Sequence, residues 1–276
     1  MEKIKRGLNI FRAVFIMQMK IYFRYPINFF MTLIDPIIWL APIYFMSKCF
    51  SLNGKFPGFE KYAGNSDYMG FVILGFMVST YVWTVSWSMG FALKEEMTQG
   101  VLESNWSAPV SRIGLLISKS AFQFCVATFE IILTGISCYF VFGFTVNANI
   151  LKALLFIMPG VIGLLGLGLA ISSAVLLLKE ANTIIDIGNN LVIGFSGGYF
   201  PLKVLPKWAL FISSMIPLTY MYDSTRAILL EQNSIMPLSK EFLLLICSMF
   251  GFCLMGALVF NTIEKRCRTK GILGTH

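Results

Sequence analysis

Residues 159–174 read PGVIGLLGLGLAISSA and lie inside an apolar run from 150 to 178. A run of this length can cross the hydrocarbon core of a bilayer as one helix. Small residues recur along one face of that helix, at Gly160, Gly163, Gly166, Ala170 and Ala174. Such a face allows close approach of a second helix, whereas a nucleotide-binding glycine loop would need a preceding strand and an acidic partner. The stretch therefore predicts a closely packed transmembrane helix.

The composition points to the same environment. The chain has 276 residues, of which 57% are hydrophobic and 13% are charged, whereas a soluble domain carries about 25% charged residues. One aqueous core could not bury that apolar surface, so lipid must solvate most of it. The net charge of +8 could suggest nucleic acid, but the basic residues concentrate at the termini and form no patch with stacking aromatics. We expect an all-α membrane protein with no nucleic-acid partner.

Six apolar runs are long enough to cross a bilayer. They lie near residues 27–49, 68–93, 113–144, 150–178, 184–200 and 241–262. An even number of spans places both termini on one side, and most of the 22 Lys and Arg residues fall on that side. The positive-inside rule then makes both termini cytoplasmic. We expect a multi-pass protein of the cytoplasmic (inner) cell membrane, with residues 27–262 as one transmembrane domain.

Two basic segments flank that domain. Residues 1–26 fit an amphipathic helix whose apolar stripe lies among Lys and Arg residues, as in helices that rest on an anionic leaflet. The stripe consists of Ile4, Leu8, Phe11, Phe15 and Met19. A signal peptide fits less well, because Lys20 and Arg24 interrupt the apolar part and no small-residue cleavage site follows. We expect a cytoplasmic interfacial helix at 1–26 and a basic cytoplasmic tail at 263–276.

The second and third runs are separated by KEEMTQGVLESNWSAPVSR, residues 94–112. Gly100 permits a sharp change of backbone direction, and a short helix can follow until Pro109 ends it. Leu102 and Trp106 are an i, i+4 pair on one outward face of that helix. Because a helix of two turns is not stable alone in water, it needs a surface to dock against. A protein partner and the lipid headgroups are both suitable surfaces.

The sequence lacks the residues of common catalytic sites. It has no GxxxxGK[ST] phosphate loop and no nucleophile beside a base. Its one histidine, His276, is the last residue, and its six cysteines form no CxxC pair. Neither catalytic residues nor a metal site are therefore expected. If the protein uses ATP, a second protein must bind it.

The fifth apolar run is broken in the segment GFSGGYFPLKVLPKWALFISSMIPLTYMYDSTRAILL, residues 194–230. The breaks fall at Gly197, Gly198, Pro201, Pro206 and Pro217. A second, amphipathic piece carries Asp223 and Arg226 at i, i+3. Broken helices at membrane depth are tolerated only where protein buries them or where they line a cavity. Within 201–236 we expect short helices that re-enter the membrane from outside, and an external loop with an interfacial helix is the alternative.

Residues 95–112 follow the pattern E-E-x-x-x-G-x-L-E-x-x-x-x-x-P-V-S-R directly after the second span. This pattern resembles the ABC transporter type-2 permease family. The order Leu-Pro-x-Trp, Pro-Leu-Thr-Tyr and Arg within 194–230 resembles the same family, as does the layout of interfacial helix, six spans and basic tail. The resemblance covers nearly the whole chain and implies that 94–112 forms a gate and a coupling helix that docks on an ATPase. The coupling residues would be Glu95, Glu96, Gly100, Leu102, Glu103, Trp106, Pro109 and Arg112.

The resemblance also implies roles within the membrane. Short re-entrant helices would close the outer mouth of a translocation path, with external gate residues Gly198, Pro201, Pro206, Trp208, Pro217, Asp223 and Arg226. The second and fifth spans would face a dimer axis. Path candidates are therefore two helical stripes, Phe76, Thr80, Trp83 and Trp87 in one span and Asp186, Asn190, Ile193 and Gly197 in the other. Packing within one subunit is the alternative for these stripes, and the intramembrane acids Asp35 and Glu130 either pair structurally or touch substrate.

We therefore expect the transmembrane (permease) subunit of an ATP-driven ABC exporter, with no enzymatic site of its own. ATP and Mg would be bound by a separate ATPase subunit in two copies, and the permease would pair with a second copy or a close paralogue. The substrate would be a hydrophobic or amphipathic drug, peptide or lipid, moved outward from the cytoplasmic side or inner leaflet. Alternatives are export of a lipid-linked polysaccharide, an ATP-independent carrier and a non-transporting membrane scaffold.

Overall fold

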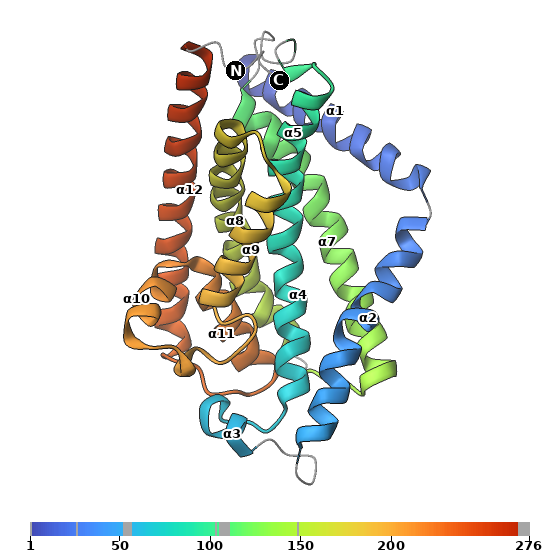
Figure 1. The fold of residues 1–276 in the computed structure, drawn as a ribbon, viewed down its shortest axis with the longest axis vertical. Helices are drawn as coiled ribbons and strands as arrows, with labels where there is room; N and C mark the ends of the chain where they lie inside the picture. The colour runs from blue at the N-terminus through green and yellow to red at the C-terminus, as the bar shows by residue number, and fades with distance from the viewer. Residues whose placement is uncertain are drawn as a thin grey trace.

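The chain forms a helical bundle in a computed structural model that describes residues 2–25, 27–51, 57–102, 104, 111–147 and 149–269 (Figure 1). The described residues contain α-helices, one π-helical turn and one 3-10 turn, and no strand. The expected all-α fold is confirmed for this part of the chain.

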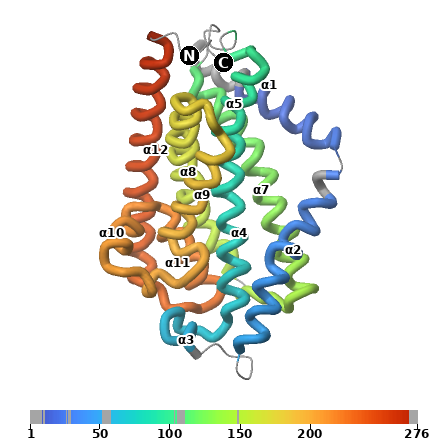
Figure 2. Tube along the Cα trace, in the orientation of Figure 1, coloured from blue at the N-terminus to red at the C-terminus, as the bar shows by residue number. Residues whose placement is uncertain are grey.

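The helices follow one another along the trace shown in Figure 2. They are α1 (Glu2–Arg24), α2 (Ile27–Phe50), α3 (Pro57–Ala63), α4 (Tyr68–Ser86), the π-helical η1 (Trp87–Phe91), α5 (Ala92–Thr98), α7 (Arg112–Phe142), α8 (Ile150–Leu178), α9 (Asn182–Phe195), the 3-10 turn η2 (Leu202–Val204), α10 (Lys207–Met215), α11 (Pro217–Leu229) and α12 (Leu238–Thr269).

Five helical segments of the described residues are long and apolar enough to cross a membrane. They are Phe30–Phe50, Tyr68–Thr98, Arg112–Phe142, Ile150–Leu178 and Leu238–Thr269. The first turn of α1 and the last turn of α12 lie at the same end of the bundle as α5, and α3, α10 and α11 lie toward the opposite end (Figure 1).

The fifth predicted span, 184–200, is not a full transmembrane helix. Its place is taken by α9, which has 14 residues and is therefore about 21 Å long at 1.5 Å per residue, shorter than the roughly 30 Å hydrocarbon core. The helix ends because Gly197 adopts a left-handed conformation with φ of 79°, and the chain then turns through η2 into α10 and α11. The six-span count is thus not confirmed.

The predicted close approach of α8 to other helices is found in the structure. A Cβ at Gly166 would collide with the backbone of Phe252 in α12, and a Cβ at Gly256 would collide with the backbone of Gly166. At Gly163 a Cβ would lie 3.2 Å from Pro217 at the start of α11. Glycine at these positions brings α8 against α11 and α12, since the missing side chains allow backbone contact.

The distribution of exposed side chains fits a lipid environment. The helices α4 and α8 contribute more residues to the buried core than any other described helix, whereas α2, α7 and α12 expose many large apolar side chains. Phe140 in α7, for example, is 78% exposed. An aqueous protein rarely exposes contiguous apolar surface on this scale, so lipid or a partner subunit would cover the outward sides of these three helices.

Candidate functional site

The second predicted span continues further than expected. The elements α4, η1 and α5 form one helical segment from Tyr68 to Thr98, whereas the sequence predicted a span near 68–93. The π-helical turn η1 places Trp87 and Phe91 on the outside, with ring centroids 5.6 Å apart, and buries Met89. Insertions of this kind occur frequently at functional sites, because they re-aim side chains within an otherwise regular helix.

Charged side chains fasten α5 to two neighbouring helices. The Oε1 atom of Glu96 lies 2.7 Å from the Nζ atom of Lys119 in α7. The Nζ atom of Lys94 donates a hydrogen bond of 2.6 Å to the carbonyl oxygen of Lys179, the residue that caps α8. These two contacts connect α5 to α7 and to the end of α8.

A second ion pair joins α7 to α12 at the same end of the bundle. The Nε atom of Arg112, the first residue of α7, lies 3.6 Å from Oε1 of Glu264. The same oxygen lies 3.8 Å from Nη1 of Arg268. We call this region, in which charges link α5, α7, α8 and α12, the charge-linked end. Sequence reasoning missed Lys119, Lys179 and Glu264, because their partners are distant along the chain and no local pattern connects them.

The structure places only part of the predicted coupling segment. Glu103, Trp106 and Pro109 lie outside the described residues. Glu95 is exposed and accepts a hydrogen bond of 3.1 Å from Nε2 of Gln99. Gly100 is exposed and has a φ of 67°, as the predicted change of backbone direction requires.

The predicted orientation of Leu102 is wrong. Its side chain was expected to face outward beside Trp106, but it is 2% exposed and belongs to the main hydrophobic core. Burial of a leucine stabilises a protein by about 2 kcal/mol, which favours the inward orientation over an exposed one. Leu102 therefore anchors the start of the segment on the bundle.

At the opposite end of the bundle, Arg226 is buried and holds three elements together. Its guanidinium donates hydrogen bonds to the carbonyl oxygens of Gly197 at 2.6 Å, Gly198 at 2.8 Å and Phe71 at 3.2 Å. The side chain is packed over the ring of Phe71. Arg226 thus links α11 to the turn after α9 and to α4. Asp223, one turn earlier, instead accepts a hydrogen bond of 2.8 Å from the backbone of Ile235.

The remaining external gate candidates are turn and cap residues. Pro201 and Pro206 precede η2 and α10, and Pro217 begins α11. Gly198 is buried, and Trp208 is exposed with its ring 6.2 Å from that of Phe195. The prolines therefore separate the short helices after α9, as the sequence indicates.

A buried acid that the sequence analysis did not select lies beside these helices. Glu241 in α12 is 1% exposed, accepts a hydrogen bond of 2.5 Å from Ser224 and receives another of 3.2 Å from the backbone of Met236. Glu241 follows Lys240 at the start of the last apolar run, where an acid is common at the water boundary, so nothing in the sequence indicated its burial. Glu241 ties the start of α12 to α11.

The two predicted stripes differ in exposure. On α4, Phe76, Thr80 and Trp83 are partly exposed, Trp87 is exposed, and the rings of Phe76 and Trp83 pack edge to face at 5.4 Å. The fifth-span stripe does not form one exposed face. Its four residues are divided between exposed Asp186 and Asn190 and buried Ile193 and Gly197.

A buried hydrogen bond joins the helices that carry the two stripes. The hydroxyl of Ser86 in α4 donates to Oδ1 of Asn189 in α9 at 2.6 Å, and both residues are buried. Neither Ser86 nor Asn189 was among the candidate residues, because the bond joins positions far apart in the sequence. It shows that one polar residue of α9 serves packing within the subunit, while Asp186 and Asn190 face outward.

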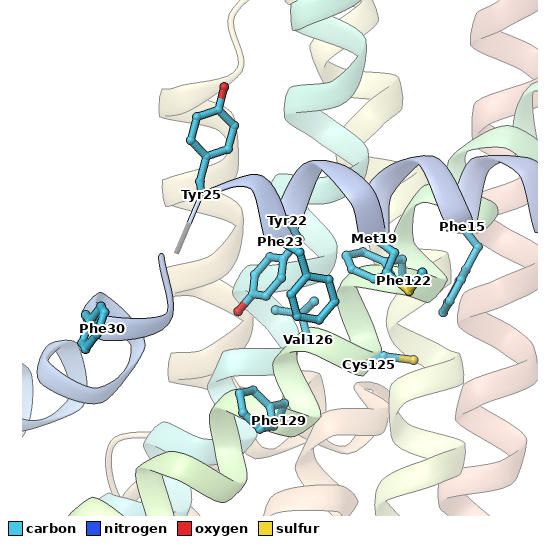
Figure 3. A pocket seen from close by; sticks show the side chains of 10 residues that line it. All are labelled: Phe15, Met19, Tyr22, Phe23, Tyr25, Phe30, Phe122, Cys125, Val126 and Phe129. Carbon is cyan, nitrogen blue, oxygen red and sulfur yellow. The ribbon is translucent and has the colours of Figure 1, made fainter. Parts of the chain in front are cut away.

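Two cavities open beside α7. A cavity of about 530 Å³ lies between α1, α2 and α7, and its walls are almost entirely apolar and aromatic (Figure 3). A second, more polar cavity of about 280 Å³ lies between α4 and α7, where Trp87, Gln123 and Glu130 line it. The predicted path residue Trp87 and the intramembrane acid Glu130 thus share one cavity, whereas Asp35 lies on α2.

A comparison with protein families identifies the chain. Residues 9–230 match the family described as ABC-2 type transporter. A search of curated proteins finds no match. The matched range covers α2 to α11 completely and most of α1, and the apolar helices of that range agree with a membrane-spanning transport domain. The chain is a multi-pass membrane protein and belongs to the ABC-2 type transporter family.

Proposed function

We propose that the chain is the permease subunit of an ATP-driven exporter, paired with a second permease and two ATPase subunits. The ATPase subunits would bind ATP and Mg. The observation that carries this proposal is the charge-linked end, where segment 94–112 leaves α5 beside the ion pairs to α7 and α12. A partner that pulls on this segment would move several transmembrane helices at once.

Closure of the ATPase subunits would displace segment 94–112 and, through Glu96 and Lys119, the start of α7. Motion of α5 would also reach α8 through the bond between Lys94 and Lys179. Interfaces of this kind convert small shifts at one site into movement of whole helices. The helices α4 and α8, which form much of the core, would carry the motion toward α11.

At the far end, the movement would act on the short helices after α9. Arg226 is bonded to the turn after α9 and to α4, so a shift of α4 would strain or release that connection. Release would open an outward path for a hydrophobic or amphipathic substrate. The partly exposed aromatic stripe of α4 favours such a substrate, since aromatic and apolar walls bind apolar ligands.

Capture of the ATPase tests this proposal. The tagged chain would be co-expressed with a candidate ABC ATPase subunit, and the amount of ATPase retained on purification would be measured. Trp106→Ala should reduce that amount, because a large aromatic on a short docking helix acts as a hot spot. Trp39→Ala, on the exposed face of α2, is the matched control and should retain it. Equal retention by both variants, or no retained ATPase with the unaltered chain, would contradict the proposal.

A further inference from the structure

The two cavities beside α7 adjoin each other. Residues Gln123, Ala127 and Glu130 repeat at helical spacing and line the polar cavity, whereas Phe122, Cys125 and Phe129 line the aromatic one. At 100° per residue, the centres of these two sets lie about 130° apart around one helix, which is a little more than a third of its circumference. Val126 lies between them and lines both cavities.

The larger cavity is suited to an apolar body. Figure 3 shows Phe15, Met19 and Tyr22 of α1 directed toward Phe122 and Phe129 of α7, with the space between them. Its volume of about 530 Å³ lies within the range of roughly 300–1,000 Å³ typical of small-molecule sites. The exposed position between α1 and α2 leaves it accessible from the lipid side, where hydrophobic ligands concentrate.

The smaller cavity is suited to a positive charge. The carboxyl of Glu130 lines it together with the ring of Trp87 and the polar groups of Thr84, Ser88 and Gln123. None of the Lys and Arg residues in the described part of the chain forms an ion pair with Glu130. A carboxylate in this setting gains most from a cationic partner, and the face of an indole ring attracts cations as well.

Two further residues bring the cavities into one site. Asp35 of α2 lies near Glu130, and Thr32 of the same helix forms a side-chain hydrogen bond with the Glu130 carboxyl group. A second carboxyl group near the first increases the local preference for a cation. Tyr22, in the wall of the aromatic cavity, also lies within electrostatic reach of Glu130. One ligand can therefore place an apolar body among the aromatic residues and a charged head beside Glu130.

We infer that this site binds an amphiphile with a cationic head, such as an ammonium or phosphonium group on an apolar body, and that Glu130 recognises the charge. The inference rests on the proposed transport function and names its substrate class. The head group lies against Glu130 and Trp87, and the body fills the cavity between α1, α2 and α7.

The test measures how tightly two lipophilic ions bind to the full chain in phosphatidylglycerol nanodiscs. Binding is measured by equilibrium dialysis, and protein-free nanodiscs give the background. Tetraphenylphosphonium and tetraphenylborate are the probes, because they share one shape and carry opposite charges. Glu130→Gln should weaken binding of the cation about tenfold or more, as expected for loss of a charge-assisted contact, and should not weaken binding of the anion. Glu60→Gln removes an exposed carboxylate of α3 and should leave both affinities unchanged.

Equal affinity of Glu130→Gln and the unaltered chain for the cation would overturn the inference, as would the absence of saturable cation binding by the unaltered chain. If Glu130→Gln does not fold, Gln123→Glu decides the question. A second carboxylate in the polar cavity should tighten cation binding, and unchanged affinity would overturn the inference. Repeating the assay in phosphatidylethanolamine identifies the source of the head group. If phosphatidylethanolamine weakens tetraphenylphosphonium binding, the lipid competes for the site and its ammonium group is the natural ligand. If tetraphenylphosphonium binding is unchanged, the ligand is a soluble amphiphile.

This assay is independent of the ATPase. Cation binding that depends on Glu130, without any retained ATPase, would contradict the proposed function alone. Retained ATPase and ATP-driven transport, without cation binding, would contradict the cation site alone.

Discussion

The guanidinium carbon of Arg226 lies 3.4 Å from the centroid of the Phe71 ring. The two residues are 155 positions apart in the chain, and a hydrogen bond from Arg226 to the carbonyl oxygen of Phe71 accompanies the ring contact. A charge buried in this way persists only when it is bonded and packed on several sides. Arg226 therefore organises the end of the bundle where α4, the turn after α9 and α11 meet.

Replacement of Arg226 should destabilise that end. Arg226→Met leaves the carbonyl oxygens of Phe71, Gly197 and Gly198 without their donor, at a cost of about 3 kcal/mol in the free energy of unfolding. Arg226→Lys should recover only part of this loss, because an ammonium group does not reproduce the planar fork of a guanidinium. Titration with SDS measures both variants. Lys203→Met, which removes an exposed positive charge nearby, is the control, and equal stability of all three variants would refute the structural role of Arg226.

The contact between α8 and α12 should tolerate no side chain at Gly166. Gly166→Ala forces a Cβ onto the backbone of α12, and overpacking of this kind costs about 1–3 kcal/mol. Gly251→Ala lies on α12 where a Cβ meets no atom within 4 Å, so it should keep the melting temperature or raise it slightly through better helix propensity. Thermal melting in detergent compares the two. A melting temperature for Gly166→Ala that matches Gly251→Ala would show that the helices do not approach so closely.

Leu102 should behave as a core residue. Leu102→Ala leaves a cavity in the main core and should lower the free energy of unfolding by about 2 kcal/mol or more. Val101→Ala, at the exposed neighbouring position, should change it by less than about 0.5 kcal/mol. Denaturant titration of both variants checks the difference. If Leu102→Ala is as stable as Val101→Ala, the side chain faces outward, as the spacing with Trp106 had indicated.

Long uninterrupted apolar runs made much of the fold predictable. The run at 150–178 coincides with α8, since its length and its small-residue face both indicate a packed transmembrane helix. The run at 184–200 was less informative, because apolarity continues past the point where Gly197 ends α9. Hydropathy records which residues avoid water, and it does not record where a helix stops.

The sequence predicted those features of the candidate site that depend on neighbouring residues, and it did not predict contacts between distant segments. The short helix expected within segment 94–112 followed from residue spacing and turn chemistry, whereas its coupling role was implied by the family resemblance. By contrast, the bond between Ser86 and Asn189 and the ion pair between Arg112 and Glu264 join positions 103 and 152 residues apart. Such contacts depend on tertiary packing, which a single sequence does not display. Leu102 illustrates the same limit, since helical spacing grouped it with Trp106 and the core buried it instead.

In this account, the charge-linked end couples ATP hydrolysis to substrate export. The number of substrate molecules exported per ATP hydrolysed tests this most directly. The chain and its ATPase would be reconstituted in vesicles, with Glu60→Lys on α3 as the control for an added positive charge. Glu96 lies 2.7 Å from Lys119, so Glu96→Lys places two positive charges together and should lower that number about fivefold or more. The double variant Glu96→Lys with Lys119→Glu restores opposite charges and should restore the number. An unchanged number in Glu96→Lys, or export that proceeds without ATP hydrolysis, would contradict the account.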